Sequence, residues 1–257
     1  MLLRTSEYIC QYFALNYINL KKFIKMKKSV IILMFVVSIS GSIFQSCTGK
    51  TGEKIEEPTT VVTEPAAISK EDAAAATVLN LQAAFKGETT ASAKYAAYSK
   101  KAEEEGSHEI AMLFHAASVA ENIHANNHKV VLEESGQTVP LITPEFTVKS
   151  TKENLKDAIE GESYESNKMY PEFMVTAKAA NNDLAGISLN YAYRTELKHL
   201  EMYKGALAAL ESNNVKSLPT VYFICPTCGN TYQTTTPKRC GISMTSTEKF
   251  LKITSLS

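Results

Sequence analysis

The sequence predicts a mainly α-helical protein in which a four-helix bundle is followed by a small β-rich module. Four long segments between residues 69 and 211 carry apolar residues at helical spacing. Two short turns and one long connection join these segments, as in a bundle built from two helical hairpins. Over residues 218–257 the pattern changes to short β-type runs with clustered cysteines.

The four expected helices have their own boundary signals. Ser69 and Ser150 each precede an acidic residue at the capping-box spacing and are therefore expected to begin the first and third helices. Pro171 removes an amide donor and is expected to bend the third helix. The expected helices cover about residues 69–105, 107–134, 150–180 and 183–211. Their connection lengths indicate the ferritin-like arrangement, with one bundle over residues 69–212.

The composition argues against a nucleic-acid partner. The chain has 257 residues, and its 27 Lys and Arg residues balance 27 Asp and Glu residues. Because basic residues are not in excess, the chain lacks the charge that binding to a phosphate backbone requires. The length suits one large domain or two small ones.

The N-terminal residues predict export. Two lysines precede the apolar run 30–44, which ends at Ser46 and Cys47, and this layout resembles a bacterial lipoprotein signal. The run is shorter than the roughly 20 apolar residues that a spanning helix needs, although a transmembrane anchor stays an alternative. We therefore expect a leader and signal over residues 1–46, with Cys47 lipidated.

The segment after this signal predicts a flexible tether. Residues 47–68 are rich in Thr, Glu, Gly and Pro and lack aromatic residues that could begin a core. A lipid anchor followed by a tether places the folded part at a membrane, facing the periplasm or the cell exterior. The alternative is a cytoplasmic protein. Because a complete signal begins at Met26, translation is expected to start there.

Each expected helix places a glutamate on its apolar face. At 3.6 residues per turn, the faces that carry Leu, Ala and aromatic residues also carry Glu88, Glu121, Glu162 and Glu196. A single glutamate could curl out to water. Burying four ionised carboxylates together costs about several kcal/mol each unless a cation neutralises them. The pattern therefore predicts metal ions inside the bundle.

The two helical hairpins look like copies of one unit. One repeated piece is a Glu-x-x-His pair, which occurs as Glu121–His124 and again as Glu196–His199. The other is a glutamate after a glycine, which occurs as Glu88 and again as Glu162. The interval between the two glycine-preceded glutamates is only one position shorter than the interval between the two pairs. Quasi-twofold pairing would assemble the ligand set of carboxylate-bridged di-iron proteins. Carboxylates with one imidazole per metal favour iron or manganese.

The C-terminal module carries three of the four thiolates of a rubredoxin or zinc-ribbon site. Cys225 and Cys228 form the first knuckle and Cys240 begins the second, but Ser243 stands where a fourth cysteine is expected. Three outcomes stay open: an iron site completed by Ser243 or water, a structural zinc site, or no metal and a Cys225–Cys228 disulfide. A hard oxygen ligand favours ferric iron, so an iron site of this kind is expected to have a lower reduction potential than a four-thiolate site.

With these motifs the sequence resembles the rubrerythrin family, whose members combine a ferritin-like di-iron bundle with a C-terminal rubredoxin-like module. The resemblance covers roughly residues 72–253. It rests on the motifs FKGETTASAKY, AENIHANNH, IEGESYESNKMYPEF, RTELKHLEMY and YFICPTCGNTY.

The resemblance implies a role for each candidate ligand. Glu121 and Glu196 would bridge the two irons. The terminal ligands would be Glu88 for one iron and Glu162 with His199 for the other. His128, one turn beyond His124, is left either beside the ligands or on the surface.

The resemblance also implies an asymmetry between the two halves. Glu165, for which Ala91 stands in the first half, would bind the first iron in the oxidised state and yield to His124 on reduction. Tyr95 and Tyr170 resemble tyrosines that donate hydrogen bonds near the cluster. Their alternative role is plain core packing.

The function implied by the resemblance is that of a di-iron peroxidase. Such an enzyme reduces hydrogen peroxide to water in oxidative-stress defence, with electrons passed through the rubredoxin-like site from an unidentified donor. The implied cofactors are two iron ions in the bundle and one iron or zinc ion in the module. Homodimers are expected, with the module of one subunit near the di-iron site of the other. The alternatives are a ferritin-like protein that binds or stores iron without turnover, and a structural lipoprotein.

Overall fold

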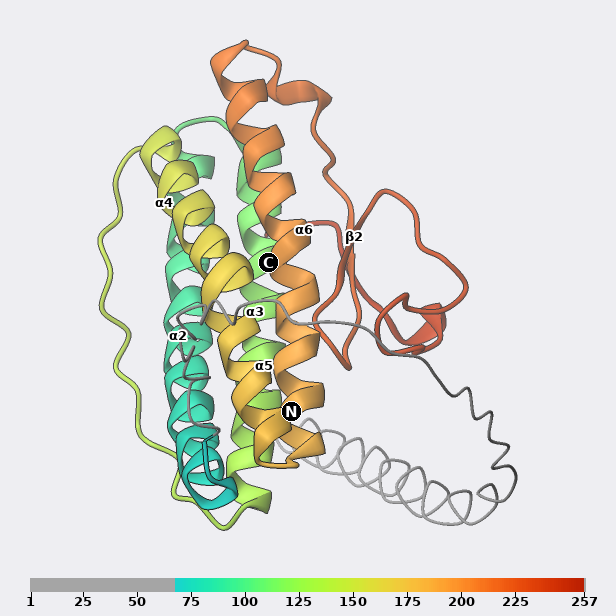
Figure 1. The fold of residues 1–257 in the computed structure, drawn as a ribbon. Helices are drawn as coiled ribbons and strands as arrows, with labels where there is room; N and C mark the ends of the chain where they lie inside the picture. The colour runs from blue at the N-terminus through green and yellow to red at the C-terminus, as the bar shows by residue number, and fades with distance from the viewer. Residues whose placement is uncertain (1–67, 257) are drawn as a thin grey trace, which may run out of the picture. The chain divides into compact units, whose positions relative to one another are not determined.

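The computed structural model describes residues 68–256 (Figure 1). Three predictions lie outside this range: a leader over residues 1–46, lipidation at Cys47 and a tether over residues 47–68, of which only residue 68 is described. They stay predictions. Among residues 68–256, no helix combines the length and the apolar character that crossing a bilayer requires.

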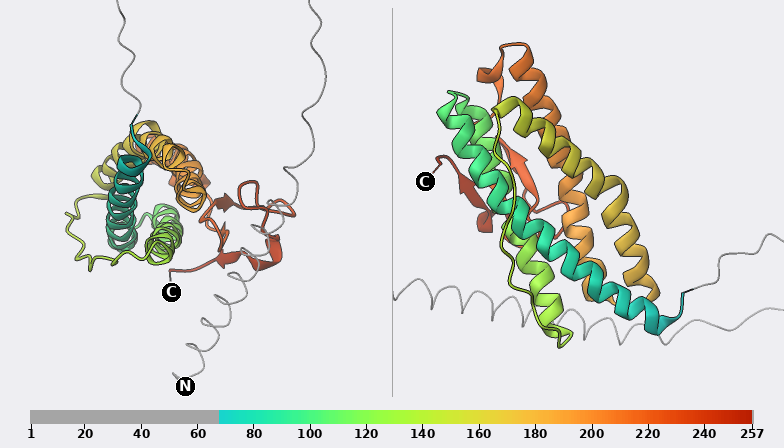
Figure 2. Two further views of the ribbon diagram at one scale, coloured as in Figure 1. Left: turned by 60° about the horizontal axis from the view of Figure 1, so that its bottom comes forward. Right: turned by 90° about the vertical axis from the view of Figure 1, so that its left-hand side faces the viewer.

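Four helical segments pack side by side as a bundle (Figures 1 and 2). The first hairpin consists of α2 (Lys70–Glu104) and α3 (His108–Glu134). In the second, α4 (Thr151–Tyr164), a π-helical segment (Glu165–Met169) and α5 (Tyr170–Ala179) run in succession and pair with α6 (Asp183–Glu211). A long connection without helix or strand joins the hairpins along the outside of the bundle (Figure 2). The predicted ferritin-like arrangement is confirmed.

Side-chain caps fix where three of these helices begin. The Ser69 hydroxyl accepts the Asp72 amide at 3.1 Å. Ser150 and Glu153 form a reciprocal capping box, and Asn182 caps α6 through the Ala185 amide. Each cap satisfies an amide that the first helical turn leaves without a partner. The two serine caps lie where the sequence predicts them.

One extra residue interrupts the third helical segment. Tyr170 lies one position further from its counterpart Tyr95 in the first half than Glu162 lies from its counterpart Glu88. The π-helix Glu165–Met169 lies between Glu162 and Tyr170. A π-helical turn absorbs an inserted residue without shifting the helix on either side. The α-helix is therefore interrupted before the bend expected at Pro171, which itself lies in the first turn of α5.

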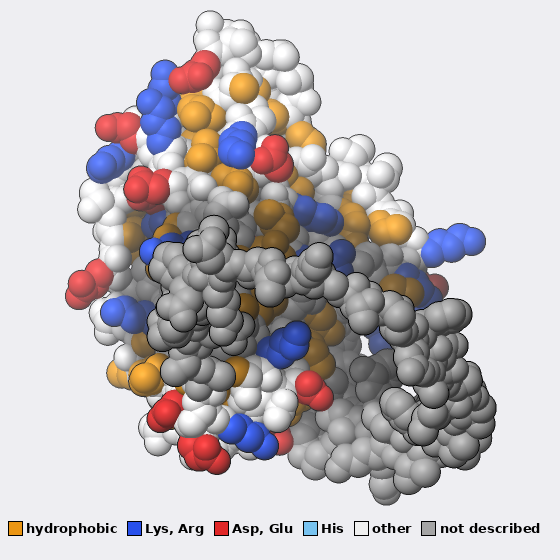
Figure 3. Space-filling model, in the orientation of Figure 1, with side chains coloured by type: hydrophobic (Ala, Val, Ile, Leu, Met, Phe, Trp, Pro, Cys, Tyr) orange, Lys and Arg blue, Asp and Glu red, His pale blue; other side chains and the backbone are white. Residues whose placement is uncertain are grey.

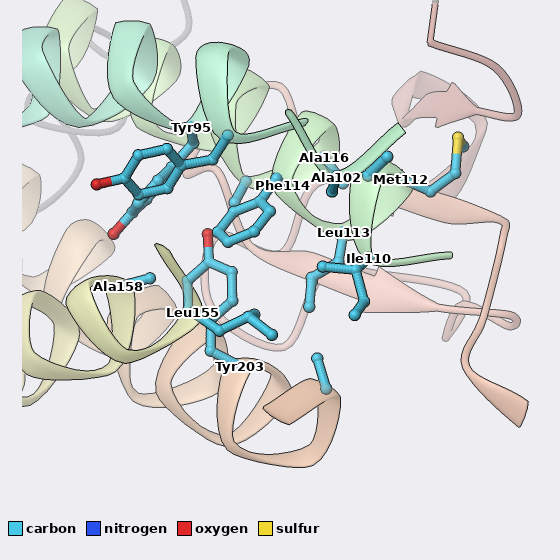
Figure 4. Close-up of a cluster of buried hydrophobic side chains, with 14 of the residues drawn as sticks. Tyr95, Ala102, Ile110, Met112, Leu113, Phe114, Ala116, Leu155, Ala158 and Tyr203 are labelled. Atoms are coloured by element: carbon cyan, nitrogen blue, oxygen red, sulfur yellow. The ribbon is translucent and has the colours of Figure 1, made fainter. Parts of the chain in front are cut away.

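Two apolar clusters fill the bundle and leave its middle for polar groups. Along α2, Leu81 and Ala84 belong to one cluster, whereas Tyr95 and Tyr98 belong to the other. The second cluster is rich in aromatic rings, and Figure 4 shows Tyr95, Phe114 and Tyr203 facing one another within it. Glu88 lies between the two clusters along the helix. Any chemistry in the middle is thus shielded on both sides by packed side chains.

The C-terminal module is a three-stranded antiparallel sheet beside α3 and α6. The central strand β1 (Tyr222–Ile224) pairs with β2 (Thr231–Gln233) and with β3 (Leu251–Ile253). Tyr222 and Ile224 are buried in the aromatic cluster of the bundle. The module and the bundle therefore share part of one hydrophobic core.

Acidic and basic side chains lie interspersed over the described part of the face drawn in Figure 3. Exposed large apolar residues such as Leu79, Leu141 and Val175 come from different parts of the fold. Such scattered apolar residues are ordinary on a protein surface.

Candidate metal centre

Four helices deliver six ligand-type side chains to the middle of the bundle. Each helix contributes one glutamate, and α3 and α6 add a histidine one turn further on. At most 1% of each residue is exposed. They are Glu88 on α2, Glu121 and His124 on α3, Glu162 on α4, and Glu196 and His199 on α6. The helical spacing thus brings together the residues that the sequence places on core faces.

The ligand-type atoms form two overlapping groups. Within each group, four atoms lie within 4.8 Å of one another, and the groups are Glu88, Glu121, His124, Glu196 and Glu121, Glu162, Glu196, His199. Glu121 and Glu196 belong to both. Each directs one carboxylate oxygen to His124 Nδ1, at 2.9 Å, and the other to His199 Nδ1, at 3.0 Å. Two carboxylates shared in this way are arranged to bridge two metal ions.

These short contacts are not hydrogen bonds. Among the described residues, the Nδ1 atoms of both histidines and all four oxygens of Glu121 and Glu196 are buried without a hydrogen-bond partner. Leaving a buried polar atom unpaired costs about 1–3 kcal/mol. Ligand atoms about 2.1 Å from one ion at right angles lie roughly 3 Å apart. The unpaired atoms therefore fit two metal ions, and the carboxylate and imidazole donors suit iron.

Two buried tyrosines bind the glutamates outside the bridging pair. The Tyr95 hydroxyl donates to Glu162 Oε1 at 2.7 Å, and the Tyr170 hydroxyl donates to Glu88 Oε1. Within the described part of the chain, the Oε2 atom of each glutamate has no hydrogen-bond partner. Each glutamate thus keeps one oxygen for a metal. The tyrosines lie near the cluster, as the resemblance implies, and also pack in the apolar clusters.

Glu165 lies at the edge of the cluster. Among the described residues, the two ligand groups include His124 but not Glu165. The exchange of Glu165 for His124 between oxidation states, which the resemblance implies, stays a prediction. Glu165 lines a pocket of about 380 Å³ between α2 and the third helical segment, together with Gly87, Lys94 and Tyr95. The pocket borders the cluster through Tyr95, whose hydroxyl donates to Glu162.

The C-terminal module holds the outer nitrogen of both histidines. His124 Nε2 lies 3.1 Å from the carbonyl oxygen of Cys228, and His199 Nε2 lies 2.9 Å from the Thr231 hydroxyl oxygen. Because a carbonyl only accepts, His124 carries its proton on Nε2. The Thr231 hydroxyl donates to the Gly229 carbonyl at 3.2 Å and so accepts from His199. Both Nδ1 atoms are therefore left free to bind metal.

The module makes these contacts with its own bundle. Asn127 on α3 donates to the Thr227 carbonyl at 3.0 Å, and Lys198 on α6 donates to Asn230 Oδ1 at 2.6 Å. The resemblance instead implies that the module lies near the di-iron site of a partner subunit. In the structure one chain thus supplies both the ligand set and the module that orients its histidines.

The three cysteines of the module converge with Ser243. The sulfur atoms of Cys225, Cys228 and Cys240 lie within 4.8 Å of one another, and all three residues are buried. Cys225 Sγ lies 3.2 Å from Ser243 Oγ. The three thiols are free, so the disulfide among the predicted outcomes is not formed in the structure. Three sulfurs with a hydroxyl at the fourth position remain a rubredoxin-like site with one oxygen.

Burial and mutual repulsion disturb the protonation of the cluster when no metal is bound. Burial raises the pKa of Glu88 to about 8, and the charge of Glu196 adds to this rise. Burial would also raise the pKa of Glu121, but His199 and His124 lower it to about 2. Burial would lower the pKa of His199, but Glu121 and Glu196 raise it to about 9. The metal-free cluster therefore binds protons in place of cations.

We expect the metal-free protein to lose stability as the pH rises from about 4.5 to 9. Folded Glu88 keeps its proton up to about pH 8, whereas the unfolded carboxyl releases it near 4.5, so folding is progressively penalised in this window. The raised pKa of His199 contributes stability that is complete below 6.5 and lost through about 9. The contribution of Glu121 has the opposite sign and is lost only as the pH falls from 4.5 towards 2.

Urea unfolding of the metal-free protein at several pH values measures this dependence. The free energy of unfolding should fall by on the order of a few kcal/mol between about pH 5 and 9. The Glu88→Gln variant, which cannot ionise at this position, should show a shallower fall. A metal-free stability that rises over the same range would contradict the assignment.

Comparisons with known proteins agree with this site. Residues 80–207 match the family model described as Rubrerythrin. The chain is similar to Rubrerythrin-2 of Clostridium acetobutylicum, with 31% identity over 171 residues that cover 66% of this chain and 92% of the relative. It is similar to Nigerythrin of Nitratidesulfovibrio vulgaris, with 34% identity over 172 residues, 66% of this chain and 83% of the relative. A structure of fully reduced, all-ferrous nigerythrin superposes with a TM-score of 0.61 at 29% identity, covering 75% and 91% of the two chains.

Proposed function

The chain belongs to the rubrerythrin family of di-iron proteins, and from this premise we propose that it is a peroxidase that reduces hydrogen peroxide to water. The observation that carries the proposal is the pair of ligand groups that share Glu121 and Glu196. The proposed ligands are the six buried residues of these groups, with Glu165 as a seventh at the pocket.

Peroxide reduction consumes two electrons and two protons and converts H₂O₂ into two water molecules. Two ferrous ions bound at the cluster would supply the two electrons, each becoming ferric. Glu121 and Glu196 fix the spacing of the two metal positions, because each carboxylate contacts both histidines. The pocket beside Glu165 and Tyr95 admits the substrate. The two apolar clusters, which lie on either side of the ligand residues along the helices, exclude water.

Protons for the reaction are held close to the metal positions. The Tyr95 hydroxyl donates a hydrogen bond to Glu162, and the Tyr170 hydroxyl donates one to Glu88. Burial raises the pKa of both phenols well above the ordinary value. Burial also raises the pKa of Glu165 at the pocket, with the charge of Glu88 adding to the rise. The two phenols therefore stay protonated at neutral pH beside the metal ligands, and Glu165 keeps its proton to a higher pH than an ordinary carboxyl group.

Electrons are proposed to enter through the C-terminal module from an unidentified donor. Cys228 is one of the three clustered thiols, and its own carbonyl accepts the hydrogen bond from His124 Nε2. A path from the module site to a ligand of the di-iron site thus consists of one residue and one hydrogen bond.

Steady-state peroxide consumption tests the proposal. The iron-loaded protein with a chemical reductant should consume hydrogen peroxide, and ferrous iron uptake should saturate at two ions per bundle. Glu201→Ala, an exposed change on α6, serves as the matched control and should leave both results unchanged. Uptake of many ions per bundle without peroxide consumption would instead indicate a ferritin-like iron store.

Replacing Ser243 by cysteine should raise the reduction potential of the module. The variant completes four thiolates around a position where the native protein offers an oxygen 3.2 Å from Cys225 Sγ. A hard oxygen ligand stabilises ferric iron, so its loss favours the reduced form. Redox titration of both iron-loaded proteins measures the difference. A native potential equal to or above that of the variant would contradict an oxygen ligand at Ser243.

A further inference from the structure

His128 is a buried residue that the proposed reaction leaves without a role. It lies on α3 one turn beyond His124 and has no exposed surface. Its Nδ1 atom lies 2.8 Å from the Ser188 hydroxyl oxygen on α6, and its Nε2 atom lies 3.3 Å from the Tyr170 hydroxyl oxygen on α5. Because Tyr170 donates to Glu88, a chain of three hydrogen bonds runs from α6 to a metal ligand on α2.

The chemistry of the groups fixes the direction of each hydrogen bond. An ionised Glu88 that binds a cation only accepts, so the single proton of the Tyr170 hydroxyl lies on this bond. His128 Nε2 must then donate to the phenol oxygen, and Nδ1 accepts from Ser188. Burial lowers the pKa of His128 to about 3, so the ring is neutral and carries one N–H proton. All donors in the chain therefore point towards Glu88.

The internal repeat shows that this chain exists in one half only. Tyr170 follows Tyr95, and Tyr203 follows His128, by the same number of positions that separates the two Glu-x-x-His pairs. Tyr95 and Tyr170 are therefore equivalent positions in the two halves, and so are His128 and Tyr203. The Tyr203 ring lies 5.4 Å from the Tyr95 ring, but among residues 68–256 its buried hydroxyl has no hydrogen-bond partner. Tyr95 thus binds Glu162 without a donor behind it, whereas Tyr170 binds Glu88 with His128 behind it.

We propose that His128 is a positioning residue that makes the two metal positions unequal. By donating to Tyr170 it strengthens the hydrogen bond from the phenol to Glu88 Oε1, whereas Tyr95 binds Glu162 Oε1 without such a donor. Glu88 is therefore the weaker donor of the two glutamates, and the metal that Glu88 and His124 would share differs from the one at Glu162 and His199. Together with the proposed function, this assumes that two iron ions occupy the cluster.

Matched variants in the two halves test the proposal. His128→Phe removes the donor and keeps a ring, and Tyr203→Phe removes a hydroxyl without a partner at the equivalent position. Mössbauer spectra of the fully reduced, ⁵⁷Fe-loaded proteins, recorded without peroxide, should show two unequal ferrous sites in the native protein. His128→Phe should alter one of them and weaken its iron binding about tenfold, whereas Tyr203→Phe should alter neither. Unchanged spectra in His128→Phe, or equal changes in both variants, would overturn the proposal.

Two further measurements cover a variant that does not fold. His128→Gln keeps a side-chain donor and should retain the native spectrum. In the native protein loaded with diamagnetic Zn²⁺, where Glu88 is ionised, ¹⁵N NMR should find the His128 proton on Nε2, and a proton on Nδ1 would overturn the proposal. Neither measurement uses peroxide, so a protein that fails as a peroxidase can still support or refute the role of His128.

Discussion

Replacing Glu196 by alanine abolishes the binding of both iron ions, because Glu196 gives one oxygen to each ligand group. Loss of a partner that merely orients a ligand costs about 10- to 100-fold in metal affinity, and loss of a shared ligand should exceed this at both positions. Peroxide consumption should fall to background with it. Iron analysis after anaerobic loading and desalting measures the effect.

A graded series separates this effect from general damage. Glu88 belongs to one of the two di-iron ligand groups only, so Glu88→Ala should retain one bundle iron ion and Glu196→Ala none, each counted beyond any ion held by the module cysteines. The metal-free Glu196→Ala protein should stay folded, because the change removes one of several mutually repelling buried carboxylates. Two retained ions in Glu196→Ala would show that the bridging assignment is wrong.

Replacing Gly229 by alanine should displace the module from α3 and slow electron delivery to the di-iron site. A Cβ atom at Gly229 would overlap the His124 ring, and the residue has a φ of +73°. The left-handed backbone alone costs an alanine about 1–2 kcal/mol. The displaced Cys228 carbonyl would no longer accept from His124 Nε2. Steady-state turnover should therefore fall by about 10- to 100-fold.

The comparison of two rates localises the defect. Turnover that depends on the module should fall more than single-turnover oxidation of chemically reduced protein, which needs no electron from the module. Gly241→Ala in the same module is the control, because its added Cβ would meet only an ordinary contact of 3.8 Å with the Tyr232 hydroxyl. Native turnover in Gly229→Ala would contradict the path through Cys228.

Local patterns explain why the bundle and its ligand faces are predictable from the sequence. The Ser69 and Ser150 caps depend on residues three positions away, and the core faces follow from 3.6 residues per turn. Glu121 and His124 therefore lie where the helical spacing places them. The π-helix is a partial exception, because its sequence signal is only that the interval between the halves grows by one position before Tyr170.

The remaining features of the site depend on contacts between distant residues. Tyr95 and Glu162 are 67 positions apart, and His124 and Cys228 are 104 positions apart. The sequence leaves His128 either beside the ligands or on the surface, because its partner Ser188 lies on another helix. That the module packs on its own bundle likewise depends on tertiary contacts that no periodic pattern records.

Single-turnover oxidation of the anaerobically reduced protein tests the central claim most directly. After loading with two ferrous ions per bundle, the protein is mixed in a stopped-flow instrument with one equivalent of hydrogen peroxide or with oxygen. We predict that one equivalent of peroxide oxidises both ions, and does so much faster than oxygen. Ferrous ions that peroxide leaves unoxidised, or that oxygen oxidises faster, would contradict a di-iron peroxidase.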